Sequence, residues 1–254
     1  MNILKSFCIA FAMYSRIPVP IFDWTEENMK YAISFFPFVG AVIMGISALW
    51  YHFAAGRAEG IVIALVGIAI SCVISGGIHL DGYMDTSDAL SSHMERERKL
   101  EILKDPHIGA FSVISIITYF LFFAGAYTAA AKSKTDMLFI FSGFIVSRIY
   151  SGLAVVLFKS AKKDGLLYTF ADNSHKTAVR ASLAAELIIY TAVMSLVSAA
   201  EAITVVAING AFWVYYYKKT KREFGGITGD TCGWFSSLSE LLTAVVAAVF
   251  CMMR

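Results

Sequence analysis

Residues 31–56 read YAISFFPFVGAVIMGISALWYHFAAG and contain no Asp, Glu, Lys or Arg. An α-helix needs about 20 apolar residues to cross the ~30 Å hydrocarbon core of a bilayer, because each residue adds ~1.5 Å. This segment is long enough, and helices buried in soluble proteins rarely run so far without a charge. It therefore predicts a transmembrane helix.

Two further runs, 61–80 and 108–131, also lack all four charged residue types. The chain is 58% hydrophobic and 16% charged, whereas soluble domains average about 45–50% and about 25%. These features exclude an ordinary soluble domain and predict an all-α, polytopic transmembrane helical bundle. Because no internal repeat is evident, we expect a single domain over residues 1–254.

The apolar runs predict seven spans. The sixth is short and could form a tight hairpin with the fifth. A shorter apolar run at 3–13 predicts an interfacial or re-entrant helix, since it cannot cross a bilayer. The predicted spans are 31–53, 61–80, 109–131, 137–158, 180–199, 202–217 and 235–253.

Positive charge is distributed unevenly between the connections. Counting Arg180 at the edge of a span, 16 of the 21 Lys and Arg lie in the N-terminal segment or in connections 81–107, 159–179 and 218–234. Because cytoplasmic loops are enriched in Lys and Arg, we expect the N-terminus and these long connections in the cytoplasm. The pattern predicts a multi-pass protein of the cytoplasmic membrane, surrounded by lipid. No nucleic-acid partner is expected. The sequence leaves open whether the protein forms a homo-oligomer.

The segment 76–88, GGIHLDGYMDTSD, follows the second run and places three acids at the membrane edge. Asp81, Asp85 and Asp88 have i, i+4, i+7 spacing, which puts them on one helix face at about 100° per residue. Carboxylates on one stripe repel each other unless a cation binds among them, and Mg²⁺ prefers oxygen ligands shared with phosphate. The alternative is a solvated acidic helix end, which the helix dipole favours. The scarcity of acids and the adjacent glycines favour a metal site.

Further candidates lie in three other segments. Lys104 and Asp105 precede the third span and could contact phosphate and metal, although Lys104 could equally extend its charge toward water. In the glycine-rich segment 225–231, the Thr228 hydroxyl and the backbone N–H groups could bind an anion at a helix start, and Asp230 adds weight to a site there, although such segments are usually simple turns. Asp164 lies in KKDG, residues 162–165, which could bind an anion, although lysines beside a membrane more often determine topology.

Arg148 is a charge within an apolar span, and such charges are costly and often functional. It could contact a substrate phosphate, or it could form a structural ion pair with Glu186 or another buried acid. The sequence leaves both interpretations open.

Five segments together resemble the cobalamin synthase family, whose members are adenosylcobinamide-GDP ribazoletransferases. They occur in the family's order and extend over nearly the whole chain. Family members often have Asp-Thr-Ala-Asp-Gly where this chain has Ser87 and Ala89, and many have Ser in place of Pro106. The acids are unaffected by these differences. The segments are SRIPVP at 15–20, 76–88, RKLEILKD at 98–105, KDGL at 163–166 and GITGDT at 226–231.

The resemblance implies an enzyme of the last assembly stage of cobalamin synthesis. It would join adenosylcobinamide-GDP to α-ribazole or α-ribazole 5′-phosphate, release GMP and require Mg²⁺. Asp81, Asp85 and Asp88 would be the catalytic and metal-binding residues, with Asp88 a candidate for accepting the hydroxyl proton. The expected substrate-binding residues are His79, Lys104, Asp105, Arg148, Asp164, Thr228 and Asp230.

Two other classes of protein share some of these features. A transporter could line an ion path with the same charges, but transporters tend to place them near the bilayer midplane and often contain repeats. A membrane prenyltransferase, or another Mg²⁺-dependent membrane phosphotransferase, also combines aspartates with diphosphate chemistry. The acids at one membrane edge and the absence of an evident repeat favour an enzyme.

Overall fold

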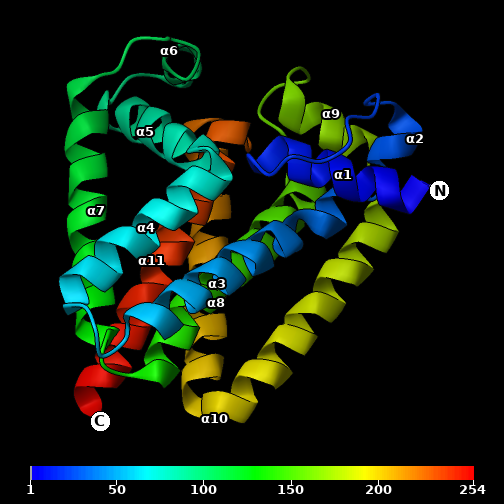
Figure 1. Ribbon diagram of the computed structural model, residues 1–254. Helices are drawn as coiled ribbons and strands as arrows, with labels where there is room; N and C mark the ends of the chain where they lie inside the picture. The colour runs from blue at the N-terminus through cyan, green and yellow to red at the C-terminus, as the bar shows by residue number, and fades with distance from the viewer. Residues whose placement is uncertain (1) are drawn as a thin grey trace.

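The computed structural model describes residues 2–254, and these residues are almost entirely helical, with no β-strand (Figure 1). The all-α prediction is therefore confirmed. The elements are α1 Asn2–Tyr14, α2 Glu26–Met29, the 3₁₀ helix η1 Ala32–Phe35, α3 Phe36–Ala54, α4 Gly60–Ser75, α5 Ile78–Ser91, α6 Arg96–Ile102, α7 Ala110–Ala130, α8 Lys134–Leu157, α9 Leu166–Asn173, α10 Lys176–Glu223 and α11 Gly229–Met253.

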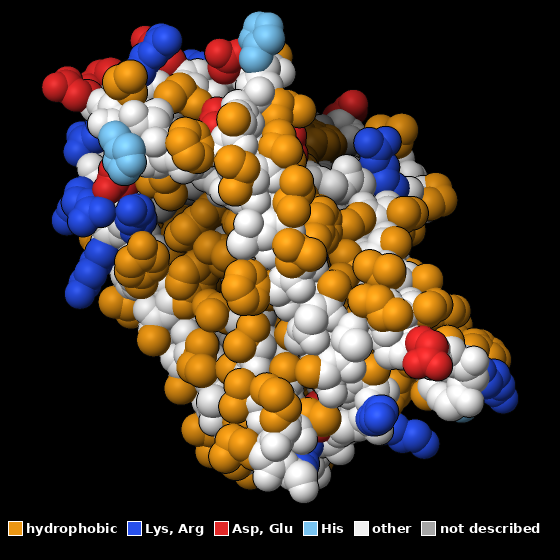
Figure 2. Space-filling model, turned by 90° about the vertical axis from the view of Figure 1, so that its left-hand side faces the viewer, with side chains coloured by type: hydrophobic (Ala, Val, Ile, Leu, Met, Phe, Trp, Pro, Cys, Tyr) orange, Lys and Arg blue, Asp and Glu red, His pale blue; other side chains and the backbone are white. Residues whose placement is uncertain are grey.

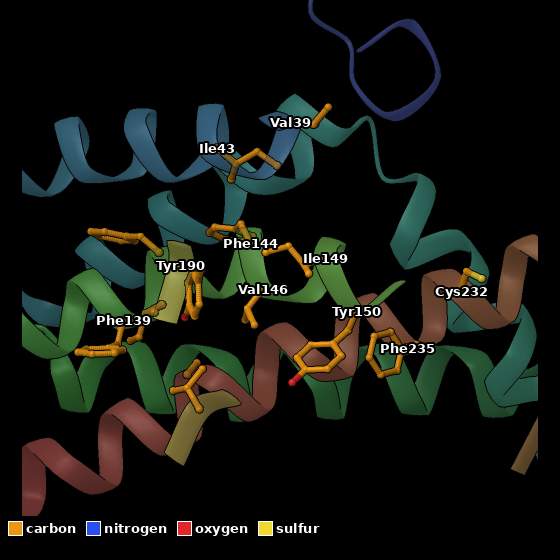
Figure 3. Close-up of a cluster of buried hydrophobic side chains, with 14 of the residues drawn as sticks. Val39, Ile43, Phe139, Phe144, Val146, Ile149, Tyr150, Tyr190, Cys232 and Phe235 are labelled. Atoms are coloured by element: carbon orange, nitrogen blue, oxygen red, sulfur yellow. The ribbon is translucent and has the colours of Figure 1, made fainter. Parts of the chain in front are cut away.

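Helix α8 forms the centre of the bundle and packs against α3, α10 and α11. Helix α8 itself carries mostly apolar and small residues on every face, which is typical of a helix enclosed by other helices. Figure 3 shows Val39 and Ile43 of α3 beside Phe144 and Ile149 of α8, and all four side chains are buried. The core therefore lies along the length of α8.

Within residues 2–254, five helical segments are long and apolar enough to cross a membrane, or six if the bent pair α4–α5 counts as one span. Figure 2 shows an apolar surface between charged groups at the two ends of the molecule. The prediction of seven spans is roughly consistent with this number, because two of the predicted spans, 180–199 and 202–217, fall within α10, which is counted here as one segment. Ser198 has extended backbone angles there, and Figure 1 shows α10 as two arms that form a V.

The predicted span 61–80 is too long at its C-terminal end. Gly76 and Gly77 have φ angles of 66° and 78°, a left-handed conformation that costs glycine little and ends α4 at Ser75. Helix α5 then starts at an angle of 95° to α4 and lies across the end of the bundle. Residues 78–80 therefore belong to a helix outside the span.

The long connections gather at one end of the bundle, as the charge pattern predicted. Figure 1 places the N-terminus, α1, α2, α6 and α9 at this end, and the C-terminus and the bend of α10 at the other. At the far end, Arg254 forms ion pairs with the fully buried Asp136 and Glu201, at 2.5 and 2.8 Å. These contacts join the start of α8, the bend of α10 and the C-terminus. We call the end that holds α5, α6 and α9 the polar end.

Helices α3 and α8 are in close backbone contact at Gly40, where a Cβ atom would lie 2.1 Å from the Phe144 carbonyl oxygen. We expect Gly40→Ala to lower the thermal unfolding temperature of the detergent-solubilised protein, because the helices must separate to admit the methyl group. Gly45→Ala is the matched control, since a Cβ there has nothing within 4 Å. Equal unfolding temperatures for the two variants would contradict this account of the packing.

Candidate active site

A cavity of about 380 Å³ opens at the polar end. Side chains from α1, α3, α5, α8, α9 and the start of α11 line it, together with the connections before α7, α9 and α11. Six of the residues predicted from sequence are at its wall. They are His79, Asp81, Lys104, Asp164, Thr228 and Asp230.

Helix α5 reaches this cavity because it packs directly on the backbone of α11. A Cβ atom at Gly82 would lie 2.7 Å from both Cα and the carbonyl oxygen of Asp230, and one at Gly233 would lie 2.8 Å from the His79 carbonyl oxygen. Only glycine permits such an approach without a shift of one helix. The contact brings Asp81 and Asp85 of α5 close to Asp230, which is far away in sequence.

The start of α11 is fixed by a capping box. The Thr228 hydroxyl accepts a hydrogen bond from the backbone N–H of Thr231 at 3.2 Å, and the Thr231 hydroxyl accepts one from the backbone N–H of Thr228 at 2.9 Å. The Thr228 hydroxyl also lies 3.4 Å from Asp230 Oδ2, to which it can donate. Asp230 is therefore held in the first turn of α11, where the helix dipole stabilises a negative charge.

The three predicted acids all lie on α5, as their spacing required. Burial, followed by the negative charges of Asp81, Asp230 and Asp88, raises the pKa of Asp85 to about 6. A carboxylate whose neighbours raise its pKa in this way would be stabilised by a cation. Sequence analysis gave Asp230 only a substrate-binding role, whereas the structure adds it to the acid group as a fourth member.

The acids do not form a complete metal site by themselves. Within residues 2–254, no three His, Cys, Asp or Glu side chains lie close enough together to hold a metal ion. Asp88 is turned toward the start of α7, since a Cβ at Gly109 would lie 1.9 Å from its Oδ2. The donor set still suits Mg²⁺, which binds one or two carboxylates and takes its other ligands from water and phosphate.

Two lysines, Lys104 and Lys162, line the same cavity as Asp81 and Asp230. The backbone of 159–161 pairs with Ile227, through Ala161 N–H to Ile227 O at 2.8 Å and Ile227 N–H to Lys159 O at 2.9 Å. This pairing brings Lys162 next to Lys104, and burial and the charge of Lys104 lower the pKa of Lys162. Lys162 donates a hydrogen bond to Leu100 O at 3.2 Å. The arrangement offers two cations to a phosphate beside the acids.

Sequence reasoning underestimated Lys162, because a lysine near a membrane usually reflects topology. It also missed the aromatic residues Tyr14 and Phe36, which line the same cavity. No local motif marks these two residues, since both read as ordinary apolar positions of helices.

Two predicted substrate-binding residues lie outside the cavity. Asp105 is exposed and contacts His107, with Oδ1 2.6 Å from Nδ1. Arg148 is 1% exposed and forms an ion pair with Glu240 at 2.7 Å. It also donates to Phe144 O at 2.8 Å. The structure thus supports the ion-pair alternative for Arg148, with Glu240 as the partner, while Glu186 accepts a hydrogen bond from Ser182.

His79 is buried at the wall of the cavity, and its Nε2 has no hydrogen-bond partner among the described residues. Burial, and the nearby charge of Arg148, lower the pKa of His79 to about 3. Its imidazole is therefore neutral, with one N–H donor and one acceptor nitrogen.

Comparison with known proteins identifies the family. The family model described as cobalamin-5-phosphate synthase matches residues 6–248. The chain belongs to this family. All of the acids and lysines described above lie within the matched range, as does the complete aromatic part of the cavity wall.

Three relatives illustrate the similarity, each called adenosylcobinamide-GDP ribazoletransferase. The protein of Lachnoclostridium phytofermentans is 44% identical over 252 residues, which cover 98% of this chain and 95% of the relative. That of Clostridium perfringens is 30% identical, covering 93% and 94%. That of Listeria monocytogenes is 30% identical, covering 94% and 95%. No solved structure matches the chain.

The pair Arg148–Glu240 can be tested as a structural unit. We expect Arg148→Met to lower stability by about 3–5 kcal/mol, because it leaves the buried Glu240 carboxylate without its partner. Replacing both residues, as Arg148→Met with Glu240→Leu, should restore most of the unfolding temperature, measured by thermal unfolding in detergent. A double variant as unstable as the single one would show that Arg148 stabilises the fold in another way.

Proposed function

We propose that this chain catalyses the transfer named in its relatives. In this reaction α-ribazole, or α-ribazole 5′-phosphate, is joined to adenosylcobinamide-GDP, and GMP is released. The observation that carries the proposal is 44% identity over 98% of the chain to a protein of that name. The cavity supports it, because a diphosphate substrate needs cations and hydrogen-bond donors next to a group that accepts a proton.

In the proposed reaction, a ribose hydroxyl oxygen of the acceptor attacks the phosphorus that is linked to cobinamide. A new P–O bond forms, the bond from that phosphorus to the bridging oxygen breaks, and the bridging oxygen leaves with GMP. The hydroxyl proton moves to a carboxylate. Asp85 is the strongest candidate for accepting it, because its raised pKa lies close to neutral pH.

Lys104 and Lys162 would balance the charge of the diphosphate, and the Thr228 hydroxyl and the backbone at the start of α11 would orient it. Holding the two substrates in position is expected to supply much of the rate, since phosphoryl transfer requires little covalent help from protein groups. Asp81 and Asp230 would hold Mg²⁺ together with oxygens of the diphosphate, which leaves Asp85 to accept the proton, while Asp88 is turned toward the start of α7. When bound, the ion would neutralise developing charge on the phosphate oxygens.

We further propose that the polar end faces the cytoplasm in the cytoplasmic membrane. The excess of Lys and Arg in the connections at this end supports this orientation. Soluble nucleotide substrates would then reach the cavity from the side where they are made.

A direct test is the release of GMP by the purified protein in lipid nanodiscs, supplied with adenosylcobinamide-GDP, α-ribazole and Mg²⁺. Asp85→Asn is expected to reduce turnover by at least about 100-fold, because the amide cannot accept the proton. Glu97→Gln removes an exposed acid from α6 at the same end and is expected to leave turnover unchanged. Normal turnover by Asp85→Asn would reject its catalytic role.

Removal of divalent ions tests the metal separately. Wild-type protein treated with EDTA is expected to lose GMP release and to regain it when Mg²⁺ is added. Binding of radiolabelled Mn²⁺ to the protein without substrates should weaken in Asp81→Asn and Asp230→Asn but not in Glu97→Gln. Full activity in the presence of EDTA would show that the carboxylates act without a metal.

A further inference from the structure

One side of the active-site cavity is aromatic, and four elements contribute to it. The Tyr14 ring of α1 lies 4.1 Å from the ring of Phe36 on α3, measured between ring centroids. The rings of His79 on α5 and Phe170 on α9 lie 6.2 and 6.4 Å from it. All four residues line the cavity. Met13, Val155, Leu166 and Leu167 extend this apolar wall.

These rings differ in how much of their surface is covered. Phe36 and Phe170 are 4% and 1% exposed, so they mainly pack behind the surface of the cavity and support it. Tyr14 is only partly buried and is central to the group, so it keeps some surface that a ligand can contact. A partly uncovered ring at the wall of a deep cavity is a natural stacking surface for a planar group.

His79 supplies a second and independent observation. Its side chain is buried, and its Nε2 has no hydrogen-bond partner in the described part of the protein. Buried polar atoms usually have a partner, and an exception at a cavity wall points to a ligand that supplies one. In the tautomer with the proton on Nε2, the imidazole has one N–H to donate there, which suits a base with one acceptor nitrogen.

The same cavity is also lined by charged side chains, those of Asp81, Asp230, Lys104 and Lys162. The cavity therefore suits a ligand with a planar apolar part at one end and a sugar or phosphate at the other. At about 380 Å³ it is within the common range of small-ligand pockets, about 300–1,000 Å³. A nucleoside fits this volume, whereas the macrocycle of a corrinoid is too large to enter it.

We propose that the aromatic wall around Tyr14 binds the benzimidazole base of the acceptor, α-ribazole, and directs its ribose toward the acids. This assignment rests on the proposed function. Benzimidazole carries one free ring nitrogen, which can accept the single N–H of His79. Guanine has several donors and acceptors on its edges, and the aromatic wall would leave most of them unpaired. The corrinoid stays at the mouth of the cavity, with only its diphosphate reaching the lysines.

The test uses intact protein in nanodiscs and measures equilibrium binding of radiolabelled α-ribazole, together with KM values for both substrates. Stacking on an aromatic side chain changes affinity for a base by about 5- to 100-fold. We therefore expect Tyr14→Leu to raise the Kd and KM for α-ribazole by that factor. Its KM for adenosylcobinamide-GDP should change less than about twofold. Tyr14→Phe keeps the ring and should bind α-ribazole almost as the wild type does.

Trp24→Leu is the matched control. Trp24 also contacts Phe170, with ring centroids 5.6 Å apart, but it does not line the cavity. Its removal should leave both KM values unchanged. If Tyr14→Leu weakened inhibition by GMP and left α-ribazole binding intact, guanine would occupy the aromatic wall and the proposal would be wrong.

A measurement on wild-type protein keeps the proposal testable if Tyr14→Leu fails to fold. Benzimidazole riboside should compete with α-ribazole at least tenfold better than imidazole riboside, because the smaller ring loses most of the stacking surface. Equal competition by both would overturn the proposal. Absence of GMP release by the wild type would instead reject the proposed function, whereas normal turnover with unaltered α-ribazole binding in Tyr14→Leu would reject the aromatic site alone.

Discussion

The candidate active site depends on the contact between the backbones of α5 and α11. Gly82 lies against Asp230, and Gly233 lies against the carbonyl of His79, at distances that leave no room for a side chain. This contact sets Asp81 and Asp85 beside Asp230 and fixes the start of α11 under the cavity. A shift of either helix would separate the acids, since they belong to segments about 150 residues apart in the chain.

Charge is arranged for a ligand more than for stability. Burial and the neighbouring acids raise the pKa of Asp85, and burial and the charge of Lys104 lower the pKa of Lys162. Each group therefore has a neighbour of the same sign, and a bound cation or phosphate would relieve the repulsion. Such perturbed pKa values in neighbouring groups are a frequent property of functional sites. Stability comes from elsewhere, in the apolar packing around α8.

Two other groups of charged residues are structural. From the sequence alone, their charges within apolar segments could be taken for part of a functional site. Arg148 and Glu240 neutralise each other inside the bundle, and Arg254 joins Asp136 and Glu201 at the end away from the cavity. In both places a buried acid has a basic partner within 3 Å. The costly charges of the spans are thus compensated inside the protein, which agrees with the general requirement for buried ions.

The sequence by itself determined the membrane-spanning helical class, the helix that carries Asp81, Asp85 and Asp88, and the gathering of the long connections at one end. These properties follow from local composition and from helical periodicity, which need no knowledge of distant contacts. Only the tertiary structure decided that Asp230 and Lys162 join the acids, that Arg148 pairs with Glu240, and that Tyr14 faces the same cavity. Each of these depends on packing between remote segments, and in particular on glycines that allow backbones to touch, so no local pattern could reveal it.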